Sequence, residues 1–242
     1  MPFTFCIFSC FFGLVATVSL SGACSEFKFI RRNMKSKGWD HLDHARFFCD
    51  SIASGTGEIG SALIFTHGAG SLIVANALSN NMCRFSSATR WYTAMAHWGG
   101  SVFADQALSL CSRYDSMKDL LDVLGTCAGR HHDKLENGVK SLQSTYLASR
   151  NSELRQVAAT SVSGAMCGHD AYGLDTGLGS ALAQVATVLT FPSDVHDAFQ
   201  TTATCQAFKP SASWDKYSKT ATYANFHMCV SAVWVGCGNV AS

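Results

Sequence analysis

A short segment of small residues, T-H-G-A-G at 66–70, separates two apolar runs of different character. Residues 61–66 have strand length, and residues 71–78 are apolar nearly all round, which is typical of a buried helix. A sharp strand-to-helix turn places its central residue at a helix N-terminus, beside an amide N–H that can stabilise an oxyanion. A serine there would attack a carbonyl carbon, but the central residue is Gly68, which leaves only the N–H of Ala69 beside it.

This segment resembles the nucleophile elbow of the α/β-hydrolase superfamily, and specifically its lipase/esterase-like branch, whose elbow often has the sequence T-H-S-M-G. Residues 196–205, H-D-A-F-Q-T-T-A-T-C, are similar to the family's acid loop and place Asp197 at the position of the triad acid. Residues 217–226, Y-S-K-T-A-T-Y-A-N-F, are similar to its histidine loop and place Tyr223 at the histidine position. The order nucleophile, acid, histidine is that of the superfamily.

The resemblance, which extends over about residues 39–226, implies a protein that has lost its catalytic residues. Gly68 and Tyr223 stand at the nucleophile and histidine positions, so Asp197 is the one triad residue retained. Removing the nucleophile of a serine protease lowers turnover about 10⁶-fold. We therefore expect an inactive lipase/esterase-like pseudoenzyme that needs no cofactor and binds a lipid or ester-like small molecule. An active carboxylic-ester hydrolase with a relocated serine and a truncated gene product stay open as alternatives.

Three residues near these positions are candidates for a relocated function. Ser71, just inside the predicted helix, is expected to cap its first turn, and His67 is expected to be structural because the family's histidine at that place is not the general base. His227 is a candidate base only under a different alignment of the histidine loop. A rival interpretation takes residues 67–70 as an H-G-G-G-type oxyanion loop, but the nearest downstream segment, 161–164, lacks the leading glycine of a G-x-S-x-G elbow.

The elements that must position these residues alternate between helix and strand. Apolar residues at helical spacing predict a helix over residues 39–54, and the order helix, strand, tight turn, buried helix is typical of a parallel α/β unit. We expect a truncated α/β-hydrolase-like parallel sheet flanked by helices, with a helical cap inserted at roughly 112–178. Further helices are expected at 102–111, 116–124, 133–148 and 179–189, a strand at 89–96, and a glycine-rich loop at 164–179.

The start of the sheet departs from the family pattern. Only 65 residues precede Thr66, whereas α/β-hydrolases usually have four strands before the elbow strand and take half of the oxyanion hole from one of their loops. The resemblance therefore implies a missing or shortened part of the sheet, which would expose a strand edge.

Composition limits the classes of function. The chain has 242 residues, 48% of them hydrophobic and 14% charged, which indicates a core-rich globular protein. Its 18 Lys and Arg nearly balance 17 Asp and Glu, so no basic excess supports nucleic-acid binding. An uncharged apolar run at residues 3–20 precedes S-G-A, which predicts a signal peptide at residues 1–23, a secreted protein and a single domain at 24–242. A membrane anchor formed by residues 3–20 and an artefactual gene start are the alternatives.

The cysteine and histidine patterns predict disulfide bonds but no metal site. Eleven cysteines fit an oxidised domain with disulfide bonds, and removal of the leader would leave nine, an odd number. No C-x-x-C pair occurs, which excludes zinc ribbons and thioredoxin-like motifs. His41 and His44, and the run H-H-D at 131–133, have the residue types of metal ligands, but such pairs are typical of polar faces, so no metal site is predicted. The aromatic cluster of Trp91, Tyr92 and Trp98 is expected in the core.

Overall fold

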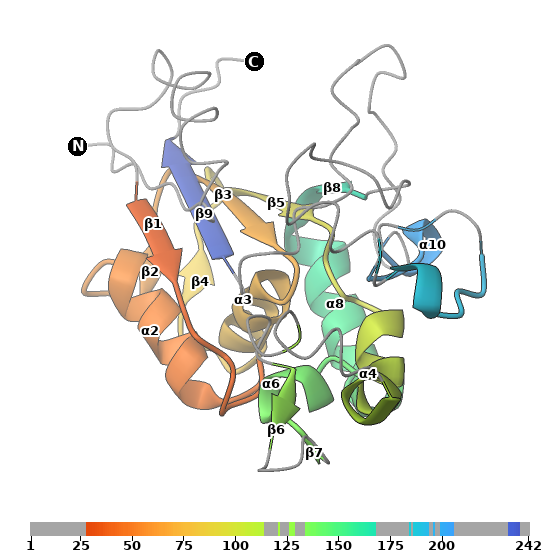
Figure 1. Cartoon of the computed structure of the whole chain (residues 1–242). Coiled ribbons are helices and arrows are strands. Elements are labelled where there is room, and N and C mark those ends of the chain that lie inside the picture. Colours follow the sequence, from red (N-terminus) through yellow and green to blue (C-terminus); the bar gives the residue numbers. More distant parts are fainter. Residues whose placement is uncertain are drawn as a thin grey trace.

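A five-stranded mixed sheet forms the centre of the fold (Figure 1). The computed structural model describes residues 28–113, 121, 126–128, 134–167, 184, 186–193, 196, 199–205 and 232–237. The strands follow one another in space in the order β1-β9-β3-β5-β8; β3, β5 and β8 run parallel, and β9 is antiparallel to both of its neighbours. Their bounds are β1 (Lys28–Arg31), β9 (Ala232–Cys237), β3 (Ala62–His67), β5 (Arg90–Ala94) and β8 (Val162–Met166).

The elbow strand β3 lies in the middle of this sheet and is paired along both edges. Phe65 stands opposite Tyr92 of β5 on one side and opposite Trp234 of β9 on the other. The C-terminal strand therefore occupies the place beside β3 that earlier strands would have filled. The expected exposed edge at the elbow strand is wrong for this reason.

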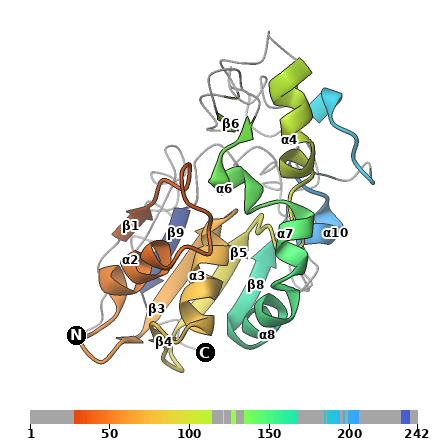
Figure 2. The ribbon, with the colours of Figure 1, turned by 90° about the horizontal axis from the view of Figure 1, so that it is seen from below.

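Three helices lie side by side over one face of the sheet: α2 (Leu42–Ile52), α3 (Gly70–Ser79) and α8 (Asn151–Ser161) (Figure 2). Helix α2 buries its apolar stripe, including Phe48, and begins at His41, whose Nδ1 accepts the Asp43 N–H at 3.2 Å. Helix α3 lies between the other two, so its residues from Gly70 to Ala77 are all buried. This central position explains why its sequence has no polar face.

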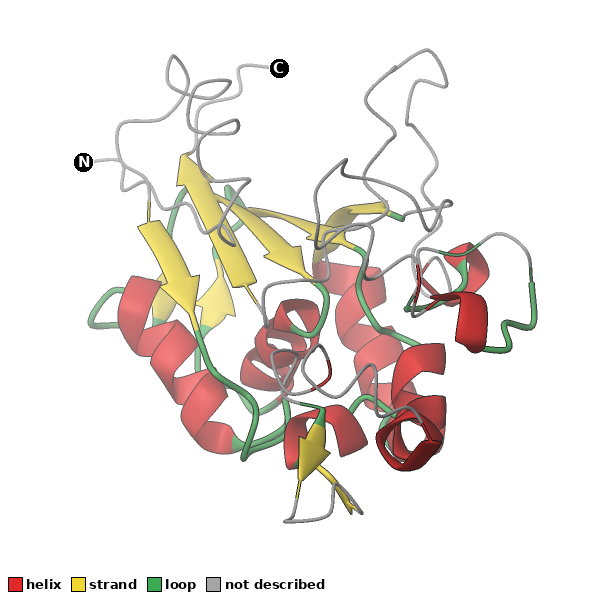
Figure 3. Ribbon diagram, in the orientation of Figure 1, coloured by secondary structure: helices red, strands yellow, loops and turns green. Residues whose placement is uncertain are grey.

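The remaining elements of the described chain are the helix α4, three short helices and two short strand pairs (Figure 3). Helix α4 packs around a second apolar cluster that includes Phe103, Leu110 and Phe199. The elements are α4 (Val102–Arg113), α6 (Asn137–Lys140), α7 (Ser144–Ala148) and α10 (Thr202–Cys205), with the strand pairs β2 (Glu58–Ile59) and β4 (Arg84–Phe85), and β6 (Cys127–Ala128) and β7 (Lys134–Leu135).

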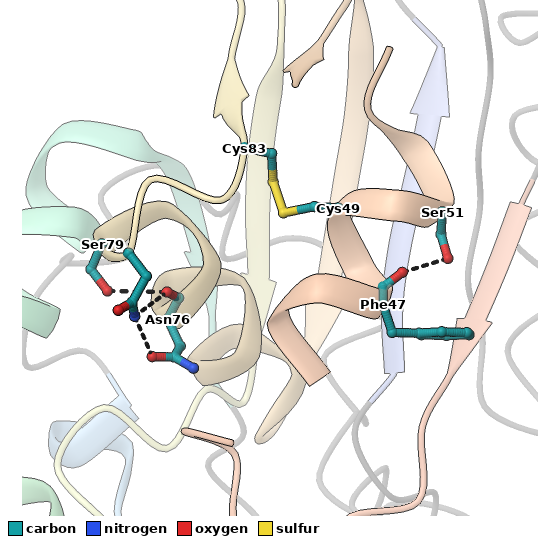
Figure 4. Close-up of a disulfide and its surroundings, with 7 residues drawn as sticks. Phe47, Cys49, Ser51, Asn76, Ser79 and Cys83 are labelled. Atoms are coloured by element: carbon teal, nitrogen blue, oxygen red, sulfur yellow. Dashed lines mark hydrogen bonds between the residues drawn. A yellow bond between two sulfur atoms is a disulfide. The ribbon is translucent and has the colours of Figure 1, made fainter. Parts of the chain in front are cut away.

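Three disulfides join segments of the described chain. Cys49–Cys83 ties α2 to the segment after α3 (Figure 4), Cys111–Cys127 ties α4 to β6, and Cys167–Cys205 ties the end of β8 to α10. Disulfides of this number are typical of proteins in oxidising compartments, as the sequence predicted. In the same described residues, no helix is both long and apolar enough to cross a bilayer. The predicted leader, residues 1–23, lies outside them.

The predicted fold class, an α/β fold with parallel strands flanked by helices, is confirmed. The helices expected at 39–54, 71–78 and 102–111 are α2, α3 and α4, and the strands expected at 61–66 and 89–96 are β3 and β5. Trp91 and Trp98 are buried in the core as expected, whereas Tyr92 is partly exposed and stacks on Phe65 with ring centroids 5.1 Å apart.

Two predicted boundaries are wrong. The expected helix at 133–148 is interrupted: it contains β7, α6 and α7, because Lys134–Leu135 pairs with β6. The expected loop at 164–179 begins too early, since β8 continues to Met166. The expected cap at roughly 112–178 stays a prediction; within that range, α8 lies in the main helical layer and β8 in the main sheet.

Candidate functional site

The turn between β3 and α3 has the geometry of a nucleophile elbow, with glycine at its centre. Strand β3 ends at His67, the backbone of Gly68 adopts φ 53°, and α3 begins two residues later. The Gly68 N–H donates to the Ala94 carbonyl at 2.9 Å, which fixes the turn against the end of β5. A left-handed φ is costly for residues with a Cβ and free for glycine, so the residue at this place satisfies the backbone without strain.

Two backbone N–H groups at this turn have no hydrogen-bond acceptor within the described residues. The N–H groups of Ala69 and Gly70 precede the first hydrogen bond of α3, which Ser71 donates to the Gly68 carbonyl at 3.2 Å. Both residues are buried, Ala69 at 5% exposure. Unsatisfied N–H groups at a helix N-terminus, where the helix dipole is positive, are suited to an oxyanion or a carboxylate. Ala69, the residue predicted to bind an oxyanion, thus offers a donor.

Ser71 does not act as a cap and is not placed as a nucleophile. Its hydroxyl lies 2.8 Å from the hydroxyl of Thr66, and both side chains are buried, at 0% and 1% exposure. The Trp91 indole N–H donates to the same Thr66 oxygen at 2.9 Å. This buried network joins β3, β5 and α3 below the turn, and it corrects the predicted capping role, because the N-terminus of α3 has no side-chain cap.

Two histidines lie at or just past the carboxyl ends of the neighbouring parallel strands β3 and β5. His67 is the last residue of β3 and pairs in register with Ala94, and it is half-buried. His97 follows β5 by three residues and is 5% exposed. Between them Met95 adopts φ 50°, an uncommon conformation for a residue with a side chain. Sequence analysis missed His97, although its place just past a predicted strand is where catalytic and binding residues of parallel sheets collect.

Neither Asp197 nor Tyr223, nor the alternative base His227, lies within the described residues. The neighbours of Asp197 do. The Phe199 carbonyl accepts hydrogen bonds from Ser101 Oγ at 2.9 Å and from the Phe103 N–H at 3.2 Å.

These bonds tie the predicted acid loop to the connection that leaves β5. The Cys167–Cys205 disulfide ties its far end to the residue after β8. Phe199 and Cys205 are therefore anchored at the carboxyl edge of the sheet, the edge at which Gly68 lies.

The rival interpretation of residues 67–70 as an H-G-G-G-type loop fails on topology. The nearest downstream candidate for its elbow, residues 161–164, lies at the junction of α8 and β8. A nucleophile elbow needs a strand followed by a helix, and this junction has the reverse order.

The described residues offer no metal site. No group of three or more potential ligands occurs among them, and the H-H-D run at 131–133 lies outside them. His44 is unsuited to a cation, because its Nδ1 accepts a hydrogen bond from Arg32 Nε at 3.2 Å. His41 uses its Nδ1 to cap α2. The predicted absence of a metal remains a prediction for the rest of the chain.

Comparisons with known proteins assign no family to this chain. No protein-family model matches the chain, and no curated protein matches it in sequence. Among solved structures, the chain is similar to the mature form of the Bacillus licheniformis lipase BlEst2, with a TM-score of 0.46 and 16% identity over 73% of this chain. The chain spans 64% of the length of that lipase.

Proposed function

We propose that this protein is a lipase/esterase-like α/β-hydrolase pseudoenzyme that binds an acyl compound, a carboxylate or ester-like small molecule, without hydrolysing it. The observation that carries the proposal is the turn at Gly68, where a strand-to-helix elbow offers backbone donors but no nucleophile. A glycine supplies no hydroxyl, so acyl transfer to the enzyme cannot begin there. The remaining Ala69 and Gly70 N–H groups can still bind a carbonyl or carboxylate oxygen.

Burial supports binding rather than hydrolysis through a substitute residue. The nearest hydroxyls, on Thr66 and Ser71, are bonded to each other below the turn and are excluded from solvent. Because Trp91 also donates to Thr66, rotating either hydroxyl toward a ligand would break a buried hydrogen bond. A relocated serine on this side of the turn is therefore disfavoured.

Hydrolysis is tested with p-nitrophenyl butyrate and with a fluorophosphonate that labels reactive serines. We expect neither turnover nor labelling of the purified, oxidised protein above the rate in buffer. A Gly68→Ser variant restores the hydroxyl without the histidine, so it too should stay inactive. Labelling of the native chain at any serine would refute the pseudoenzyme proposal and favour the relocated-nucleophile alternative.

Binding is tested with octanoate and methyl octanoate by isothermal titration calorimetry. The Ala69→Pro variant removes one N–H donor, and its backbone φ of −65° already suits proline. We expect this variant to bind octanoate about ten- to a hundredfold more weakly, since one hydrogen bond to a charged ligand contributes about 1.5–3 kcal/mol. Circular dichroism checks that the variant is folded. Equal affinity of a folded variant and the native chain, or no binding of either probe, would refute a ligand site at the turn.

A further inference from the structure

A buried histidine joins the first strand of the sheet to the helix that covers it. His44 of α2 is 2% exposed, and its Nδ1 accepts a hydrogen bond from the Nε of Arg32, which directly follows β1, at 3.2 Å. Arginine can only donate, so this bond requires an unprotonated Nδ1. The other ring nitrogen, Nε2, is buried.

The groups around the ring are mainly basic. Arg32 lies beside it from the segment after β1, Lys37 from the loop before α2, and His41 from the preceding turn of the helix, with ring centroids 6.1 Å apart. The neighbouring acid, Asp43, is already bonded to Lys37 at 2.5 Å and lies 3.5 Å from His41 Nδ1. No described carboxylate pairs with His44 itself.

A proton on His44 would therefore break the Arg32 bond and place two positive charges against each other in a buried site. Burial is the largest influence and lowers the pKa of His44; a hydrogen bond to the Lys37 backbone opposes it, and the charges of Arg32, His41 and Lys37 lower the pKa further. A lowered pKa in the folded state means that the stabilisation is fully present above the unfolded value of about 6.5 and is lost as the pH falls below it.

We propose that His44 is the sensor of an acid-sensitive latch that holds β1 and the segment after it against α2, and that mild acid loosens this edge of the sheet. Lys28 Nζ at the start of β1 also bonds to α2, through the Ser51 carbonyl. Strand β1 lies at the edge of the sheet, paired on one side with β9 alone, so its loosening leaves the β3, β5 and β8 core intact. This inference does not depend on the function of the turn at Gly68.

The test is hydrogen exchange of the full, oxidised chain between pH 7.5 and 5.0, corrected for the intrinsic pH dependence of exchange. We expect amides of residues 28–37 and of the first turn of α2 to lose protection on acidification while α3 keeps it. For each pH unit below the unfolded pKa at which His44 stays unprotonated in the folded chain, the fraction of molecules with this edge open should rise about tenfold. The His44→Asn variant keeps an acceptor at the δ position without a titrating ring, and it should abolish the acid response.

The matched control is His41→Asn, which removes a solvent-exposed histidine and preserves a side chain suited to the N-cap. It should respond to acid as the native chain does. Arg32→Gln retains a donor without the charge and should weaken the response, which tests the latch even where His44→Asn does not fold. The proposal is overturned by a native chain that keeps protection at pH 5.0, by equal responses of the two histidine variants, or by loss of protection spread evenly over α3.

Discussion

Replacing Gly68 by a residue with a side chain should destabilise the protein, although it would bring the turn closer to a catalytic elbow. The native residue has φ 53° and is buried. A residue with a Cβ has a higher conformational energy in this left-handed backbone geometry, and this cost applies to both the Gly68→Ala and the Gly68→Ser variant. The serine hydroxyl would have the Ala69 and Gly70 N–H groups, which have no acceptor among the described residues, close by as donors, so it should add little to the cost of the backbone.

The magnitude follows from two opposing contributions. The left-handed conformation costs about 1–2 kcal/mol for a residue with a Cβ. Replacing glycine restricts the unfolded chain, which returns about 0.4–1 kcal/mol. We therefore expect a net loss of about 1 kcal/mol in the free energy of unfolding, which for a chain of this size lowers the Tm by about 2–4 °C.

The assay is thermal unfolding followed by circular dichroism at 222 nm, with disulfides intact. The matched controls are Gly55→Ala and Gly60→Ser, at glycines where an added Cβ meets no atom within 4 Å and whose φ is not left-handed. These controls should leave the Tm unchanged or raise it slightly, because only the unfolded chain is affected.

Either a Tm that does not fall or a Tm that falls too far would contradict this explanation of Gly68. A Gly68→Ser variant that melts above the native protein, or together with the Gly60→Ser control, would show that the turn carries no backbone constraint. The explanation of glycine at the nucleophile position by relief of strain would then be wrong. A fall well beyond 4 °C in Gly68→Ala would show that the Cβ collides with its surroundings, so that conformation alone is not the cause.

Three further outcomes are expected. Trp91→Phe removes the donor to Thr66 and leaves a small cavity, so urea unfolding should show a loss of about 2 kcal/mol, and an unchanged midpoint would contradict the buried network. The Tyr146 hydroxyl donates a hydrogen bond to the Asp40 carboxylate at 2.6 Å. This bond and burial raise the pKa of Tyr146 to about 12. Stability from this bond should be present below pH 10 and be lost between pH 10 and 12, and spectrophotometric titration should show a late-ionising tyrosine that Tyr146→Phe removes. Replacing both Cys49 and Cys83 by alanine removes a disulfide between residues 34 apart and should lower the free energy of unfolding by about 4 kcal/mol. An unchanged Tm would show that packing alone holds α2 to the segment after α3.

Local patterns in the sequence were sufficient for the elements around the turn. The apolar run before 66–70 and the nonpolar helix after it predicted β3 and α3, because both segments are buried on nearly all sides and neither depends on a distant partner for its type. The helical spacing of apolar residues predicted α2, because one face of that helix is buried and the other is exposed. The glycine at the centre of the turn is also a property of the sequence alone.

Pairing between distant segments decided the rest. Strand β9 lies beside β3 although more than 160 residues separate them, and no local pattern specifies such a partner. Gly164 was assigned to a loop, yet it belongs to β8, where a Cβ would lie 3.1 Å from the ring of Tyr92. The burial of Ser71 against Thr66, and of His44 against Arg32, likewise depends on which elements pack together. The sequence thus determined which residues could react, and the tertiary structure determined which polar groups are already bonded to one another, because hydrogen-bond partners distant in the chain meet only in the folded core.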